Sequence, residues 1–258
     1  MRLGAGMRGE RDERRGERDA LEMTIHDVRT TPADEGDQSA GYQSVTLGTT
    51  RGELALRYYH VVGARRGVAL VGGAGGGWDT PGRGQLYPRL CEDLASAGLA
   101  AVRVRYRQPN MLAECVLDVL AALHFLECLG VEAAAVVGHS FGGAVALQAA
   151  VHAENVRAVV TLSTQGRGAD AAGELPPGCA ALFVHGTADE LLRPTCSQYA
   201  FELAREPKRL RLYAGARHGL DEAADEIRAE VRGWVVDHLC GGQPDGSSRG
   251  GAVEPAVP

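Results

Sequence analysis

The sequence predicts an α/β fold, with a mostly parallel, twisted sheet and helices on both faces. Three observations support this prediction. Short apolar runs alternate along the chain with amphipathic runs of helical spacing. The apolar runs are continuous, as expected for strands that are buried on both faces of a parallel sheet. Glycine or proline punctuates the pattern where one element gives way to the next.

The first elements that we expect are two strands, residues 43–48 and 53–61, joined by a turn at residues 50–52. This spacing predicts an antiparallel N-terminal hairpin. A buried strand at 67–71 follows and ends in a cluster of glycines. The later expected elements are a helix at 86–97, a strand at 100–106, a helix at 111–129, a strand at 133–137, a helix after Ser140, strands at 156–162 and 180–185, a helix after Pro194, a strand at 209–213 and a final helix with Ile227, Val231, Trp234 and Val235 on one face.

The two ends of the chain differ from its middle. Residues 8–19 mix both signs of charge and contain no apolar side chain, so we expect residues 1–41 to form a disordered, charged segment. Translation that starts at Met23 instead of Met1 would explain part of this segment. The tail 241–258 is rich in glycine and serine and is expected to be flexible. Residues 42–240 then form one folded domain.

Composition excludes several classes of function. The net charge is −6 and no basic stripe is present, so we do not expect a nucleic-acid partner. Six cysteines lie scattered without Cys-x-x-Cys pairs, which is typical of reduced thiols in a cytoplasmic protein. No apolar run is long enough to span a bilayer, so no membrane partner is expected. No motif implies a metal or organic cofactor, and the sequence does not predict the number of subunits.

The segment around Ser140 carries the clearest chemical signal. Ser140 stands in a Gly-x-Ser-x-Gly frame between a predicted strand and a predicted helix. Gly138 and Gly142 have no Cβ, so a very tight turn can close there and push the hydroxyl out of the sheet. The backbone N–H of Phe141 points into the same space, where it can bind an oxyanion. The alternative interpretation is a glycine-rich loop that only packs the helix on the strand.

A serine hydroxyl needs a base to take its proton and an acid to orient that base. Asp189 follows the strand at 180–185, and His218 follows the strand at 209–213. Since ligands of such sheets bind beyond the carboxyl ends of the strands, we expect these residues to meet Ser140. Glu190 is the alternative acid, although Asp189 fits the motif spacing better.

These motifs, residues 138–143, 185–189 and 217–220, resemble small, lid-less α/β-hydrolases of the dienelactone-hydrolase and esterase kind. The resemblance implies that Ser140 is the nucleophile, that His218 is general base and then general acid, and that Asp189 orients the histidine. It would suggest a cysteine nucleophile for a dienelactone substrate, whereas this chain has serine, which favours ordinary ester chemistry. The short linker between the strands ending at 162 and beginning at 180 predicts no substantial cap domain.

The glycine cluster at 72–77 does not fit a nucleotide site. It lacks the Lys-Ser/Thr of a phosphate loop, and Trp78 stands where a dinucleotide fingerprint needs glycine. Matched to the family's His-Gly-x pattern, the cluster makes Ala74 the second oxyanion donor, with Gly75 as the alternative. The candidate pocket residues, for which simple packing is an equal alternative, are Trp78, Tyr87, His139 and Gln165.

The resemblance therefore predicts a carboxylic ester hydrolase whose partner is a small ester, thioester or related acyl compound. Two other functions remain open. The same triad also serves acyltransferases and perhydrolases, because the acceptor is chosen by the pocket and by access of water. A non-catalytic ligand-binding protein on the same fold is the third possibility, and the presence of all three triad residues argues against it.

Overall fold

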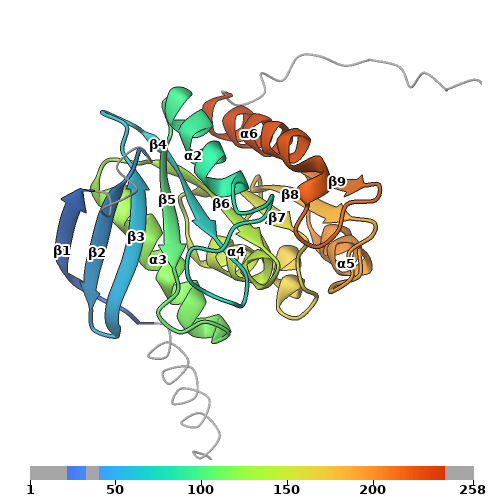
Figure 1. Cartoon of the computed structure of the whole chain (residues 1–258). Helices are drawn as coiled ribbons and strands as arrows, with labels where there is room; N and C mark the ends of the chain where they lie inside the picture. Colours follow the sequence, from blue (N-terminus) through green and yellow to red (C-terminus); the bar gives the residue numbers. More distant parts are fainter. Residues whose placement is uncertain (1–21, 33–40, 242–258) are drawn as a thin grey trace, which may run out of the picture.

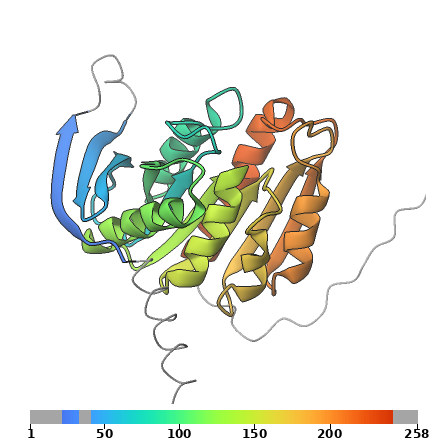
Figure 2. The same cartoon turned by 90° about the horizontal axis from the view of Figure 1, so that it is seen from below.

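The computed structural model describes residues 22–32 and 41–241. A nine-stranded sheet forms its centre, and helices cover both faces (Figures 1 and 2). The strands are β1 (Ile25–Pro32), β2 (Gln43–Thr49), β3 (Gly52–Tyr59), β4 (Arg66–Val71), β5 (Ala100–Arg105), β6 (Ala133–His139), β7 (Val156–Leu162), β8 (Ala180–Gly186) and β9 (Lys208–Tyr213). The helices are α2 (Leu86–Ser96), α3 (Leu112–Cys128), α4 (Phe141–His152), α5 (Thr195–Leu203) and α6 (Ala224–Cys240).

The strand order is β1-β2-β3-β5-β4-β6-β7-β8-β9. The pairs β1-β2, β2-β3 and β3-β5 are antiparallel. All pairs from β5-β4 onward in this order are parallel. The carboxyl ends of β4, β6, β8 and β9 therefore meet at one edge of the sheet, where the register pairs Val71 with Gly138 and Gly186 with Tyr213. This edge is where a ligand site of an open α/β sheet is expected.

Burial on both faces explains why the parallel strands were recognisable. In β4, Val68 and Leu70 pack toward α2 and α6, whereas Ala69 and Val71 pack toward α3 and α4. All four side chains are almost completely buried. A strand with helices on each side needs apolar residues at every position, which gives the continuous runs seen in the sequence. The predicted α/β-hydrolase architecture is confirmed, and most element boundaries differ from the prediction by only one or two residues.

Strand β1 corrects the expectation that residues 1–41 are disordered. It pairs with β2 along its length, so the predicted hairpin is a three-stranded antiparallel unit. Almost all β1 side chains are exposed, and Arg29 forms an ion pair with Glu53 on β3. Backbone hydrogen bonds hold such an edge strand without apolar burial, which is why a composition argument missed it. Residues 1–21, 33–40 and 242–258 lie outside the described residues.

The segment between β7 and β8 contains one short 3-10 helix, η1 (Ala169–Glu174). It packs against α4 and α5, and no large cap is evident in the part of the chain that the structure describes. No helix within residues 22–32 and 41–241 combines the length and apolar character needed to cross a membrane.

Candidate active site

Ser140 occupies the tight turn between β6 and α4. Its backbone has φ 58° and ψ −120°, a conformation that is strained for any residue with a side chain. A Cβ on Gly138 would collide with the carbonyl oxygen of Gly142, and a Cβ on Gly142 would collide with that of Gly72. The Ser140 N–H donates to the carbonyl of Leu162 at 2.8 Å, which ties the turn to β7. The two glycines of the motif are therefore required by close backbone approach.

His218 and Asp189 meet beyond the ends of the neighbouring strands β9 and β8. The Nδ1–H of His218 donates to Oδ2 of Asp189 across 2.8 Å. The other carboxylate oxygen, Oδ1, accepts the N–H groups of Leu191 at 2.9 Å and Leu192 at 2.8 Å. Glu190, the alternative acid, accepts the backbone N–H of His218 at 3.2 Å and does not bind the ring. Asp189 is thus the carboxylate that orients the imidazole.

The environment of Asp189 keeps its carboxylate ionised. Burial alone would raise the pKa of Asp189, since the side chain is 0% exposed. The hydrogen bonds from the Leu192 N–H, from His218 and from the Leu191 N–H outweigh this penalty, and the pKa lies below its usual value. An anionic, fixed carboxylate both selects the Nδ1–H tautomer of His218 and stabilises an imidazolium when one forms.

Ser140 and His218 line the same cavity, which has a volume of about 370 Å³. His139 also lines it. The Nε2–H of His139 donates to the carbonyl of His218 at 3.0 Å, and the two rings lie 4.9 Å apart. Burial lowers the pKa of His139 to about 4, so the ring is neutral at physiological pH and acts as a brace for the His218 loop. The other lining residues are Gly73, Ala74, Gly75, Asp79, Thr80, Pro81, Arg83, Gly84, Gly219 and Asp221.

The loop after β4 lies directly against the serine. A Cβ on Gly73 would stand 3.6 Å from Ser140 Cβ and 3.9 Å from Ser140 Oγ. At Gly73 the loop therefore presents backbone, and no side chain, to the hydroxyl. Two tyrosine hydroxyls hold the loop: Tyr87 donates to the Val71 carbonyl at 2.9 Å and Tyr106 to the Gly72 carbonyl at 3.3 Å. Ala74 and Gly75, the two candidate oxyanion donors, follow in this loop, and both line the cavity.

Comparison with known proteins decides the family. A family model described as the alpha/beta hydrolase fold matches residues 81–219, a range that includes the serine, the acid and the histidine. The chain belongs to the α/β-hydrolase family. A search of curated proteins found no match.

Solved structures of hydrolases share the fold of this α/β-hydrolase. Dienelactone hydrolase from Anabaena variabilis superposes with a TM-score of 0.66 at 20% identity, covering 77% of this chain and 99% of that one. Est1E from Butyrivibrio proteoclasticus gives a TM-score of 0.64 at 16% identity, covering 73% and 95%. An esterase domain from Rhodothermus marinus gives 0.59 at 17%, covering 81% and 100%. At these identities the likeness shows the fold.

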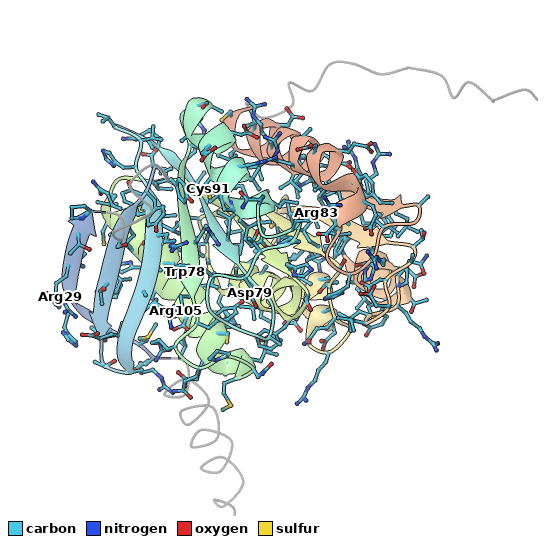
Figure 3. All side chains as sticks on the ribbon, in the orientation of Figure 1. Arg29, Trp78, Asp79, Arg83, Cys91 and Arg105 are labelled. Carbon is cyan, nitrogen blue, oxygen red and sulfur yellow. The ribbon has the colours of Figure 1, made fainter. Side chains whose placement is uncertain are left out.

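Three of the four predicted pocket residues do not line the cavity of this α/β-hydrolase. Tyr87 is 1% exposed and braces the loop from within the core. Trp78 lies on the loop after β4 near Asp79 (Figure 3), where its ring stacks on the Arg57 guanidinium at 4.5 Å. Gln165 donates from its amide to the Arg167 carbonyl at 2.8 Å. Each side chain is therefore engaged in holding local structure.

The turn at residues 81–84 is a part of the site that sequence analysis missed. Gly82, Arg83 and Gly84 all have positive φ, at 66°, 55° and 75°. The Gly82 N–H donates to the Gly219 carbonyl and the Arg83 N–H to Asp221 Oδ1, both at 2.7 Å. Asp221 lies in the 3-10 helix η2 (Asp221–Ala223) and binds this turn. The Pro-Gly-Arg-Gly sequence signals a turn, although not its partner.

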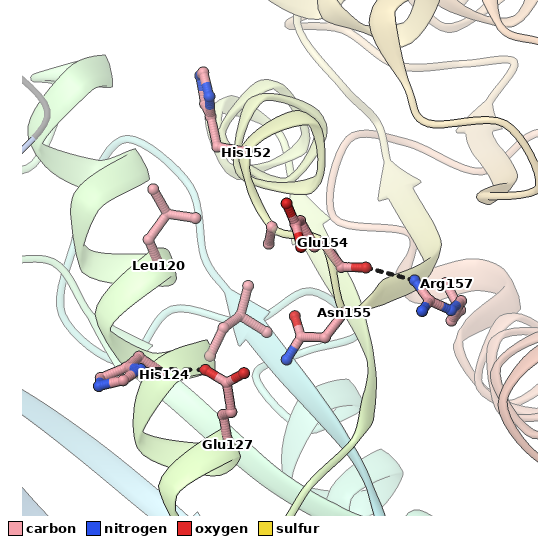
Figure 4. Close-up of a pocket in the computed structure, with 9 residues that line it drawn as sticks. Leu120, His124, Glu127, His152, Glu154, Asn155 and Arg157 are labelled. Carbon is pink, nitrogen blue, oxygen red and sulfur yellow. Dashed lines mark hydrogen bonds and ion pairs between the residues drawn. The ribbon is translucent and has the colours of Figure 1, made fainter. Parts of the chain in front are cut away.

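A larger hollow, of about 500 Å³, lies at the opposite end of α4 (Figure 4). Its lining includes His124 and Glu127 of α3, whose side chains pair at 3.2 Å and are each 59% exposed. Arg157 donates to the Glu154 carbonyl at 2.6 Å. Across residues 22–32 and 41–241, no three His, Cys, Asp or Glu side chains are grouped so as to hold a metal ion.

Proposed function

We propose that the protein is a serine hydrolase of the carboxylic ester hydrolase type, which cleaves a small ester, thioester or related acyl compound through an acyl-enzyme. One observation carries this proposal. Ser140 stands on a strained strand-to-helix turn at the same cavity as His218, whose ring is held by the ionised Asp189. This combination brings a candidate nucleophile, a candidate base and an orienting carboxylate to one cavity, and these are the three groups that catalysis through an acyl-enzyme uses.

In the proposed acylation step, His218 takes the hydroxyl proton of Ser140 through Nε2 while Oγ attacks the acyl carbon. The carbonyl oxygen becomes an oxyanion and accepts hydrogen bonds from the Phe141 N–H and from the N–H of Ala74 or Gly75. Asp189 stabilises the imidazolium of His218. The tetrahedral intermediate collapses when His218 returns the proton to the leaving alcohol or thiol, which leaves the acyl group on Ser140.

Deacylation repeats these steps with water as the nucleophile. His218 takes a proton from water, the hydroxide oxygen attacks the acyl carbon, and His218 then protonates Ser140 Oγ as the acid product leaves. Every proton that moves in this scheme passes through one imidazole. The proposal therefore needs no metal ion or organic cofactor.

The character of the cavity supports a small or exposed acyl group. Its volume of about 370 Å³ is at the low end of the range for ligand pockets. Glycines and polar side chains make up most of its lining, with Ala74 and Pro81 as the apolar members. The short β7–β8 segment adds no cap over it. A long acyl chain would find little apolar surface to bury.

Steady-state kinetics with p-nitrophenyl esters tests the proposal. We expect turnover to be highest with the acetate and to fall as the acyl chain lengthens to butyrate and octanoate. His218→Ala should lower kcat by about 10⁴-fold, because Ser140 loses its base. Lack of turnover with all three esters in the folded wild-type protein, or near-normal turnover in His218→Ala, would contradict the proposal.

A further inference from the structure

A second histidine contacts the carboxylate of the proposed triad. His185 is the second-to-last residue of β8. We propose that His185 is a positioning residue for catalysis: its Nε2–H, shared between the Leu192 carbonyl and the Asp189 oxygen that also binds His218, limits how strongly Asp189 favours the protonated form of His218. This proposal rests on the proposed function, since it concerns the base of that reaction.

The geometry places two imidazoles on one oxygen. His185 Nε2 lies 3.0 Å from Asp189 Oδ2, and His218 Nδ1 lies 2.8 Å from the same atom. The side chains of His185 and Asp189 are 0% exposed, whereas His218 is 12% exposed and lines the cavity. His185 therefore reaches the reaction only through the carboxylate.

The neighbours of His185 fix its tautomer. Its Nε2 faces two acceptors, the Asp189 carboxylate and the Leu192 carbonyl at 3.1 Å, so Nε2 must carry a proton. Its Nδ1 lies 2.7 Å from Oγ of Ser197. Burial lowers the pKa of His185, which keeps the ring neutral. Nδ1 then carries no proton and accepts a hydrogen bond from the Ser197 hydroxyl. The ring is held in one orientation, with its Nε2–H between the Leu192 carbonyl and the Asp189 carboxylate.

Ser197 extends this arrangement into α5. Its side chain is fully buried, and its hydroxyl binds the His185 ring. Ser197, His185 and Asp189 thus form a closed serine–histidine–acid chain that shares its acid with the open one of Ser140 and His218. Neither Ser197 nor His185 lines the cavity, so neither can touch a substrate there. The buried chain acts by holding Asp189.

Sharing the carboxylate has an electrostatic consequence. Asp189 accepts three hydrogen bonds, from two backbone N–H groups on Oδ1 and from His218 on Oδ2, and His185 Nε2 lies 3.0 Å from Oδ2 as well. When the His185 donor is removed, more negative charge remains on Oδ2 for His218, and the imidazolium is favoured. His218 then becomes an available base only at higher pH.

The other ionisable groups around His218 are His139 from β6, Glu190 after β8, Asp79 and Arg83 from the loop after β4, and Arg217, Asp221 and Glu222 on its own loop.

Three variants separate this role from simple packing. His185→Leu removes the donor, His185→Gln keeps an N–H at similar reach, and Ser197→Ala removes the hydroxyl that orients the ring. The measurement is the pH dependence of kcat/KM for p-nitrophenyl acetate, with the pH dependence of fluorophosphonate labelling at Ser140 as a second readout. We expect the acidic limb to move to higher pH by roughly half to one unit in His185→Leu. Ser197→Ala should shift it less, and His185→Gln should restore the wild-type limb.

The outcomes are distinguishable. A purely structural His185 would lower the melting temperature and the active fraction of the variants while the acidic limb stayed in place, which would overturn the inference. If His185→Leu does not fold, an unmoved limb in folded Ser197→Ala would overturn it as well. Failure of the proposed function is seen in the wild-type protein, as an absence of both turnover and labelling at every pH, and it would overturn both proposals.

Discussion

The hollows at the two ends of α4 have similar ingredients and different construction. Both are lined by histidines and carboxylates, and the one at the C-terminal end of α4 is the larger. At the N-terminal end, the side chains come from the carboxyl ends of several parallel strands. At the other end, His124 and Glu127 are one turn apart on a single helix and each is 59% exposed.

The difference shows that size and composition do not make a reactive site. An exposed pair on one helix is worth only a few tenths of a kcal/mol and holds neither partner in place. Asp189, by contrast, is fully buried and accepts three hydrogen bonds, one of which holds the His218 ring at the cavity. The carboxyl ends of parallel strands bring residues that are distant in the sequence together with the groups that hold them. The strained turn at Ser140 is likewise held by a neighbouring strand, through the hydrogen bond of its N–H to the Leu162 carbonyl.

Removal of the proposed nucleophile should give the largest effect and separate the two hollows most clearly. Ser140→Ala leaves no oxygen to form the acyl-enzyme, so kcat for p-nitrophenyl acetate should fall by about 10⁴-fold or more. The matched change at the other end of α4, His152→Ala, should leave kcat within about twofold of wild type. A loss of activity in His152→Ala that equals that in Ser140→Ala would overturn the distinction between the two hollows.

Asp189→Asn tests the buried carboxylate. The amide keeps the shape but offers a neutral acceptor, or an N–H donor that opposes the Nδ1–H of His218, so we expect kcat to drop by roughly 10³- to 10⁴-fold with little change in KM. Glu127→Gln is the control in the other hollow and should have no effect on turnover. Retention of most activity in Asp189→Asn would show that another group orients His218.

The turn at Ser140 can be tested through its glycines. Gly138→Ala places a methyl group against the Gly142 carbonyl and should destabilise the protein by about 1–3 kcal/mol, together with a loss of activity. Gly233→Ala in α6 is the control, because a Cβ there meets open space and removal of a helical glycine should stabilise by about 1 kcal/mol. Urea denaturation of both variants measures the difference. Wild-type stability and activity in Gly138→Ala would contradict the required close approach.

The last test concerns the pH dependence of stability at the cavity end. Burial lowers the pKa of His139 to about 4, whereas the unfolded chain takes up that proton near pH 6.5. Between these values the unfolded state binds more protons, so the free energy of unfolding should decrease as the pH falls from about 6.5 to 4. His139→Gln should flatten this slope in part, since the buried His185 acts in the same direction. An unchanged slope in urea titrations at several pH values would argue against a neutral, partly buried His139.

The sequence predicted the parallel half of the fold and the three residues that converge at its edge, because periodicity and motif spacing are local. It missed β1, whose exposed side chains leave no apolar pattern. It left Tyr87 open between the pocket and the core, because an aromatic residue suits both equally and only the hydrogen bond to the Val71 carbonyl decides between them. The contacts of Arg83 with Asp221 and of His185 with Asp189 depend on tertiary structure, and spacing alone does not reveal them.

The central claim is that Ser140 is a nucleophile activated by His218. Treatment of the folded protein with a fluorophosphonate, followed by peptide mapping, tests it most directly. The account predicts one adduct per chain on Ser140, no adduct in Ser140→Ala and strongly slowed labelling in His218→Ala. Labelling should persist in Ser197→Ala, because Ser197 is buried in the wild-type protein and is not the residue that reacts. Absence of an adduct in folded wild-type protein, or an adduct on a different residue, would contradict it.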